Sequence, residues 1–246
     1  VGSEMCIRDR SKYFKSVNHR YLPLDKLENY LETVKKPFCV FITSDFPHGP
    51  YPKNSSYSNE DIFKLPYDKG YIPNFKRGYY QNIKDDNTQL ELVLNMVKAN
   101  NLVENSIFIY ASDHGISGKW GVAEQGLRVP FVVRWPGVVA PNTVSESLLN
   151  FVDVLPTFLD IIGAEIPSDI DGKSFQATLK GSQAPVHDYI YSISTRQNIQ
   201  ACKIFPSRAV RGKRYKFIRN YNSLEVLASN YGNNAAVNAF IKIGAE

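Results

Sequence analysis

Apolar residues recur at helical spacing in three parts of the chain. The patterns cover Pro23–Lys35, about Tyr79 to Asn100, and Phe151–Ile162. In the first segment, four apolar residues recur at every third or fourth position behind Pro23, a residue suited to the first turn of a helix. Gly163 follows the last segment, where a glycine commonly ends a helix. The pattern therefore predicts three helices, the second of them long.

Short runs of branched and aromatic residues predict strands between and after these helices. The runs are Phe38–Thr43, Ser106–Tyr110, Val129–Val133, Tyr189–Ser192 and Tyr215–Arg219. Strands that alternate with helices favour an α/β fold, with a mixed, largely parallel sheet flanked by helices. From about Gly181 the strands become short and aromatic, and Gly212-Lys213 suits a hairpin turn. This last part predicts a small α+β subdomain.

Composition and charge narrow the classes of partner. The 246 residues are 43% hydrophobic, enough for a sizeable core, and no apolar run is long enough for a membrane span. The net charge of +5 is mild. The basic run Arg208–Arg219 alternates with apolar residues, which favours a hairpin with a solvated basic face over nucleic-acid binding. We therefore expect neither a nucleic-acid partner nor a membrane span.

A pair of metal-ligand residues follows one of the predicted strands. Asp113 and His114 lie at the carboxyl end of Ser106–Tyr110, the end at which ligands bind in open α/β sheets. A carboxylate and an imidazole can bind a divalent cation, and the ammonium of Lys119 suits an anionic oxygen. Alternatively, Asp113 and His114 only form a cap and a turn after the strand, and Lys119 is a solvated surface residue.

A histidine with a restrained backbone follows another predicted strand. His48 lies between two prolines in the segment Ser44–Pro52, which begins a long stretch rich in Pro, Gly, Ser, Asn and Tyr. Long loops in compact domains often surround active sites, and prolines fix the backbone that carries the imidazole. The alternative is a solvated turn histidine.

Five blocks of the sequence carry a resemblance to a known family. In chain order they are DHG, GKW, EQGLRVPFVVRWPG, SLLNFVDVLPTFLDIIG and DGKSF, within roughly Pro37–Gly181. In order and spacing they resemble the second half of the formylglycine-dependent sulfatases, which implies an alkaline-phosphatase-like α/β fold. The segments Tyr191–Gln200 and Ser207–Asn222 are similar to bacterial sulfatases of the heparan N-sulfatase kind. The resemblance therefore implies a sulfated glycan as substrate.

The resemblance implies a role for each candidate residue. Asp113 and His114 match metal ligands, Lys119 matches a lysine that contacts the sulfate, and His48 matches a histidine placed against the sulfate ester. The implied catalytic and substrate-binding residues are therefore His48 and Lys119. The implied metal is Ca²⁺, with Mg²⁺ and Mn²⁺ as alternatives because imidazole is softer than the oxygen ligands that Ca²⁺ prefers.

Other charged residues of the matched blocks are expected to be structural. Glu124, Arg128 and Arg134 would form a charged turn after the lysine, held by an arginine. The sequence departs from the family pattern here, with Gly121 at a position where a hydroxyl residue is common and Gln125 at a position where glycine is common.

The three cysteines do not supply the family's nucleophile. Cys6 lies within residues 1–10, which are expected to be a non-native leader. Cys39 is expected to be a small core residue inside a strand. The family forms formylglycine from the cysteine of a C-x-P-S-R element. In CKIFPSR, three residues separate Cys202 from Pro206 where that element has one, and the segment follows the matched blocks instead of preceding them. We therefore expect a fragment, inactive alone, without the family's amino-terminal half and its formylglycine.

These observations together give the expected organisation and function. Residues 1–10 would be a non-native leader, 11–180 the C-terminal part of a sulfatase catalytic domain, and 181–246 a small C-terminal subdomain, complete or truncated. The parent would hydrolyse sulfate esters or N-sulfate of a sulfated carbohydrate or aryl sulfate, in the periplasm or after secretion. The alternatives are a phosphonate monoester or phosphodiester hydrolase of the same superfamily, and a non-catalytic glycan-binding relative. The sequence leaves the oligomeric state open.

Overall fold

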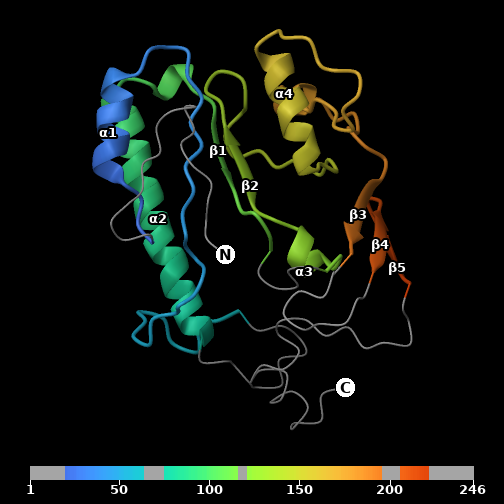
Figure 1. Ribbon diagram of the computed structural model, residues 1–246, viewed down its shortest axis with the longest axis horizontal. Coiled ribbons are helices and arrows are strands. Elements are labelled where there is room, and N and C mark those ends of the chain that lie inside the picture. Colours follow the sequence, from blue (N-terminus) through green and yellow to red (C-terminus); the bar gives the residue numbers. More distant parts are fainter. Residues whose placement is uncertain (1–19, 64–74, 116–120, 196–205, 222–246) are drawn as a thin grey trace. The chain divides into compact units, whose positions relative to one another are not determined.

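The computed structural model describes residues 20–63, 75–115, 121–195 and 206–221 (Figure 1). The described residues divide into two compact units, the first ending at Val103 and the second beginning at Glu104. The domain boundaries expected after residues 10 and 180 remain predictions.

Two helices begin the described chain, helices and strands then alternate from β1 to β3, and three successive strands follow. The helices are α1 (Leu24–Thr33), α2 (Phe75–Ala99), α3 (Glu124–Leu127), α4 (Val154–Ile161) and α5 (Gln176–Leu179), with 3₁₀ turns η1 (Val103–Asn105) and η2 (Phe151–Asp153). The strands are β1 (Phe108–Ala111), β2 (Phe131–Arg134), β3 (Ile190–Ser194), β4 (Ser207–Arg211) and β5 (Lys216–Asn220). The three expected helices are confirmed, and so are four of the five expected strands. None of the helices in the described part of the chain is long and apolar enough to cross a membrane.

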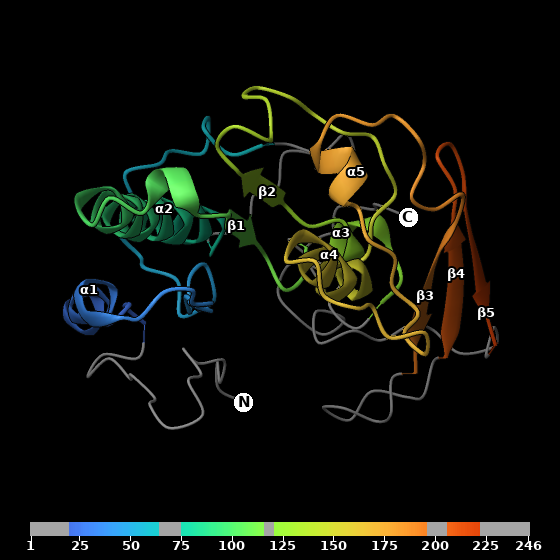
Figure 2. The same cartoon turned by 90° about the horizontal axis from the view of Figure 1, so that it is seen from above.

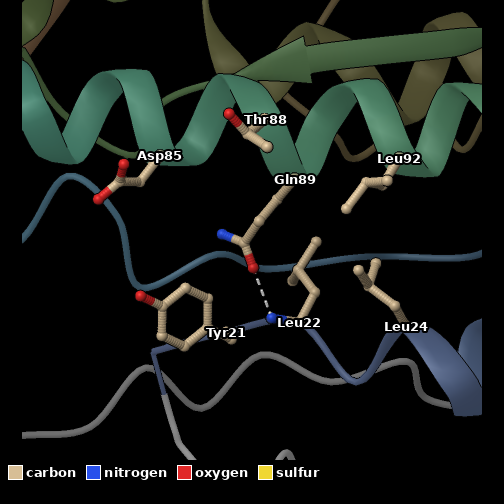
Figure 3. Close-up of a pocket in the computed structure, with 7 residues that line it drawn as sticks. All are labelled: Tyr21, Leu22, Leu24, Asp85, Thr88, Gln89 and Leu92. Carbon is tan, nitrogen blue, oxygen red and sulfur yellow. Dashed lines mark hydrogen bonds between the residues drawn. The ribbon is translucent and has the colours of Figure 1, made fainter.

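In the first unit, α1 packs along α2 through an apolar stripe. Leu27 and Leu31 of α1 are buried, with 2% and 8% of their surface exposed. The buried face of α2 is largely polar, because it includes Asn82, Asp86 and Gln89. The side chain of Gln89 accepts a hydrogen bond of 2.7 Å from the backbone N–H of Leu22, across a shallow pocket (Figure 3). Side-chain amides of α2 therefore hold the extended chain beside it.

Two expectations for the segment Phe38–Thr43 are wrong. The segment forms no strand in the structure, and Cys39 is exposed instead of being a core residue. Phe41 is also 57% exposed. A strand needs a neighbour that accepts its backbone hydrogen bonds, and no described residue pairs with this segment. The apolar run indicates a propensity for strand structure, but a strand forms only where a neighbouring strand pairs with it.

The second unit contains two small antiparallel sheets (Figure 2). In one, β1 pairs with β2, with Phe108 opposite Arg134 and Ala111 opposite Phe131. The other has the order β3-β4-β5. In its described part, the connection between β1 and β2 contains the four-residue helix α3, and antiparallel neighbours need no longer crossover than this. The α/β class is confirmed, while the parallel strands of the expected mixed sheet are not among the described pairings.

A fully buried carboxylate organises the core of the second unit. Asp153 has 0% of its surface exposed. Its Oδ2 accepts a hydrogen bond from the backbone N–H of Asn150 at 2.7 Å. Its Oδ1 accepts from the N–H of Lys173 at 2.8 Å and from Nε2 of His187 at 2.9 Å. Three separate segments therefore meet at one side chain.

The loop after α4 packs so closely on the backbone next to this carboxylate that it requires a glycine. A Cβ atom added at Gly172 would lie 1.9 Å from the carbonyl oxygen of Val152. Real Cβ atoms do not approach this closely, so the DGKSF segment requires glycine at position 172.

Replacing Asp153 by alanine should destabilise the second unit by about 3 kcal/mol or more, since several donors lose a charged acceptor inside the core. Urea unfolding followed by tryptophan fluorescence measures this change. The control is Asp169→Ala, which removes an exposed carboxylate and should leave the midpoint unchanged. Equal midpoints for the two variants would contradict the assignment.

Candidate active site

The Asp113-His114 pair lies in a tight turn directly after β1. Strand β1 ends at Ala111, and the Ser112 hydroxyl donates a hydrogen bond of 2.7 Å to the carbonyl oxygen of His114. The Asp113 side chain is 78% exposed and that of His114 32% exposed. The expected position at the carboxyl end of the strand is confirmed, and both side chains are open to ligands.

The turn is fixed to the segment that returns to β2. The backbone N–H of Gly115 donates to the carbonyl oxygen of Gly126 at 2.9 Å. A Cβ atom at Gly115 would lie 2.2 Å from the carbonyl oxygen of Gln125. The glycine of the DHG block is therefore needed for close backbone approach, which fixes the turn that carries Asp113 and His114.

His114 presents one nitrogen for coordination. Its Nδ1 lies 2.7 Å from the carbonyl oxygen of Gly115. A carbonyl only accepts hydrogen bonds, so Nδ1 carries the proton and Nε2 of the neutral ring keeps its lone pair. This arrangement, with one ring nitrogen bonded to a backbone carbonyl, is typical of metal-ligating histidines.

The pair fits a shared cation but does not complete its coordination shell. Nε2 of His114 lies 3.9 Å from Oδ1 of Asp113. Metal–ligand bonds of roughly 2.0–2.6 Å allow one ion to contact both atoms. Among the described residues, no group of three or more His, Cys, Asp or Glu side chains could hold a metal ion. The pair therefore fits as part of a site whose other ligands come from elsewhere.

His48 lies on an exposed loop whose backbone is held from two sides. Its carbonyl oxygen accepts hydrogen bonds of 2.9 Å from the Asn82 side chain and 2.9 Å from the Arg20 guanidinium. Arg20 also donates to the carbonyl oxygen of Pro50 at 2.9 Å, and its guanidinium lies over the ring of Phe46. The loop conformation is therefore set by an amide of α2 and by a cation that clamps the chain.

The imidazole of His48 is exposed and oriented by its own backbone. Its Nδ1 lies 2.8 Å from the carbonyl oxygen of Gly49, so this nitrogen carries a proton. Nε2 then faces away from that contact and can exchange a proton with a ligand. His48 belongs to the first unit, and Asp113 and His114 belong to the second.

Lys119 lies outside the described residues.

Glu124 of α3, five positions further on, is held by the C-terminal sheet. Its carboxylate lies 2.8 Å from Nζ of Lys216 and 3.6 Å from Nε of Arg211. Glu124 thus begins a short helix instead of lying in the expected charged turn, and its ion-pair partners come from β4 and β5.

The pKa of Glu124 is lowered from its ordinary value. Burial acts to raise it, but the hydrogen bond from Lys216 and the charges of Lys216, Arg211 and Arg128 outweigh burial. A lowered pKa means that the carboxylate stabilises the fold at neutral pH. That stabilisation is lost as the pH falls through the lowered pKa.

The residues that hold these loops were the part of the site that sequence reasoning missed. Arg20, Asn82 and the basic partners of Glu124 act on backbone or charge many positions away in the chain. The one signal available for Asn82 was a polar residue within a long helical pattern, which also suits a solvated position.

Comparison with known proteins identifies the family. The sulfatase family profile matches residues 14–164, and the profile of the C-terminal part of N-sulphoglucosamine sulphohydrolase matches residues 112–230. The first match covers more than half of the chain and includes the DHG turn. The chain belongs to the sulfatase family.

Curated relatives and solved structures agree with this assignment. An ulvan-active sulfatase of Formosa agariphila is 47% identical over 238 residues, which are 94% of this chain and 47% of that protein. An endo-4-O-sulfatase of Bacteroides thetaiotaomicron is 29% identical over 61% of this chain and 34% of its own length. The chain thus spans about half, or less, of these relatives.

Two solved structures show the same fold. One, from a study of glycosaminoglycan metabolism by Bacteroides thetaiotaomicron, matches 90% of this chain and 56% of its own with a TM-score of 0.64 and 21% identity. Another, BT4656 in complex with its substrate D-glucosamine-2-N,6-O-disulfate, matches 63% of this chain and 33% of its own with a TM-score of 0.56 and 25% identity. The alkaline-phosphatase-like α/β fold expected from the sequence is confirmed.

Replacing Glu124 by glutamine should lower the melting temperature slightly at about pH 7 and by less near pH 3, because the stabilisation is lost as the pH falls through the lowered pKa of the carboxylate. The change at neutral pH should stay below about 1 kcal/mol, since the carboxylate is partly exposed. Thermal scans at both pH values test this, with the exposed Glu146→Gln as control. A difference that grows on acidification would show that the ion pairs do not stabilise the native state.

Proposed function

We propose that this chain supplies part of the active site of a sulfatase that hydrolyses sulfate esters or N-sulfate groups of a sulfated glycan. The observation that carries the proposal is the Asp113-His114 turn inside the matched region, with a carboxylate oxygen and the Nε2 atom of the imidazole 3.9 Å apart. Both groups are exposed at the end of β1, where a substrate can reach a bound ion.

The metal held by this pair is proposed to be Ca²⁺, with Mg²⁺ and Mn²⁺ as the alternatives. Asp113 supplies the hard oxygen that these cations prefer, and His114 supplies the softer nitrogen that Mn²⁺ accepts more readily. A bound divalent cation would polarise the sulfuryl oxygens and favour a bound nucleophile in its ionised form. Asp113 would also place a carboxylate beside the cation.

His48 is proposed to assist departure of the alcohol or amine from sulfur. When protonated, its Nε2 can donate a proton to the leaving oxygen, while Nδ1 stays bound to the Gly49 carbonyl. The two hydrogen bonds on the His48 carbonyl keep the ring's root fixed during this transfer. Preorganisation of this kind avoids a reorganisation cost at the moment of reaction.

Lys119 is proposed to neutralise a sulfuryl oxygen as negative charge builds up on it. By resemblance to the family, the attacking hydroxyl belongs to a formylglycine formed from a cysteine in a C-x-P-S-R element, and no such element occurs in these 246 residues. The proposed contribution of this chain is therefore half of the metal shell and the groups that bind and protonate the sulfate ester.

A sulfated glycan is the proposed substrate class. Support comes from the N-sulphoglucosamine sulphohydrolase match over residues 112–230 and from a relative named for its activity on ulvan. Because such polymers are met outside the cytoplasm, we propose that the parent protein acts in the periplasm or after secretion.

In the protein expressed from its complete coding sequence, Asp113→Ala should remove the metal and the activity together, because the cation loses its hard ligand. Elemental analysis of the purified variant decides this, with the exposed Asp25→Ala as control. Full metal content in a folded Asp113→Ala protein would show that Asp113 is only a turn residue.

In the same protein, Lys119→Ala and His48→Ala should each lower kcat/KM by roughly 10²–10³ with little change in melting temperature. The loss for His48→Ala should shrink for aryl sulfates with acidic phenols, since such leaving groups depart without a proton. A series of aryl sulfates and one sulfated sugar measures both effects.

An equal loss for all leaving groups would remove the proton-donor role of His48. A large fall in melting temperature would mean that the residue is structural. Faster turnover of an aryl phosphonate than of the matching aryl sulfate would instead assign the protein to the phosphonate hydrolases of the superfamily.

A further inference from the structure

The three-stranded sheet β3-β4-β5 has two chemically different faces. On the inner face, Ser194, Ser207 and Ala209 are buried, with 7%, 5% and 5% of their surface exposed. Arg211 and Lys216 lie opposite one another on this face and form the ion pairs with Glu124. The inner face is therefore buried at these positions of β3 and β4, and its cations form ion pairs with Glu124.

The outer face begins with an exposed aromatic row. Tyr191, Val210 and Phe217 lie directly opposite one another on the three strands, so their side chains share one face. Tyr191 is 69% exposed and Phe217 is 65% exposed. Apolar residues gathered in this way on a protein surface mark a binding site more often than scattered single ones do.

The next row of the outer face is basic. Ile193, Arg208 and Arg219 lie opposite one another in the same register. The guanidinium groups of both arginines lie over the ring of Tyr221, at 5.7 Å and 4.9 Å from its centroid. Among the residues that the structure describes, no carboxylate forms an ion pair with either arginine.

We propose that this outer face (Tyr191, Ile193, Arg208, Val210, Phe217, Arg219 and Tyr221) is a binding surface for a sulfated glycan chain, separate from the Asp113-His114 turn. The guanidinium groups of Arg208 and Arg219 match the charge of sulfate groups and can donate hydrogen bonds to an anion, while Nη1 of Arg208 also donates to the carbonyl oxygen of Ser207 at 3.1 Å. The exposed rings offer flat apolar surface on which the faces of sugar rings can lie. Charge complementarity thus selects the occupant.

The choice of a sulfated glycan over other polyanions rests on the proposed function, whereas the surface contains none of the residues proposed for catalysis. Its role would be to hold a polymer while one unit reaches the catalytic groups. Binding can be measured without turnover, so loss of binding here and loss of the proposed activity are separate outcomes.

The test is the affinity of the 246-residue chain for immobilised heparin, with completely desulfated heparin as the unsulfated probe. Arg208→Gln/Arg219→Gln should weaken binding to heparin by roughly tenfold, because two charge-assisted contacts are lost. The matched control is Lys213→Gln/Arg214→Gln, which removes the same charge from the hairpin turn and should change the affinity by no more than about twofold.

Phe217→Ser tests the aromatic row and should also weaken heparin binding, whereas Ile162→Ser, at a 74% exposed position after α4, should not. Equal losses for the two double variants would reduce the effect to net charge and overturn the proposal. So would equal affinity for desulfated heparin, or equally tight binding of a single-stranded DNA oligonucleotide. A Phe217→Ser protein that melts early and still binds heparin would show that another part of the protein covers this face.

Discussion

The second unit depends on one buried charge with a full set of donors. Ionised carboxylates are costly to remove from water, so Asp153 is tolerated only because backbone and imidazole donors surround it. The same requirement fixes where the donors come from. One precedes α4, one follows Gly172 and one is His187, just before β3. The start of α4, the DGKSF segment and the approach to the C-terminal sheet are thereby specified together, although the sequence separates them by up to 34 positions.

Buried side-chain amides have a similar role in the first unit. Asn82 and Gln89 are buried on α2, and both hold backbone groups of neighbouring chain that has no strand partner. Backbone groups that lie outside regular structure still need hydrogen bonds when they are shielded from water. Side-chain amides meet that need because each carries donors and an acceptor. The long helix is thus a frame for the irregular segment that carries His48.

Local signals were sufficient for most elements and for the Asp113-His114 turn. Helical periodicity located α1, α2 and α4, and the short branched runs located β1, β2, β3 and β5. These features depend on residues close together in sequence. The strand expected at Phe38–Thr43 failed because strand formation needs a partner that the local pattern cannot supply. Likewise, the clamp of Arg20 on the His48 loop and the ion pairs of Glu124 depend on long-range contacts, which leave no periodic signal.

Side chains alternate between the two faces of the C-terminal hairpin, so the basic residues of Arg208–Arg219 have two different roles. Arg211 and Lys216 face inward and neutralise Glu124, while Arg208 and Arg219 face outward. The run therefore cannot be treated as one charged patch. In a systematic scan of this segment, charge-removing substitutions would fall into two phenotypic classes set by strand parity. Substitutions of the inward-facing residues would alter the folding of the unit. Substitutions of the outward-facing residues would alter only the binding of ligands to the outer face.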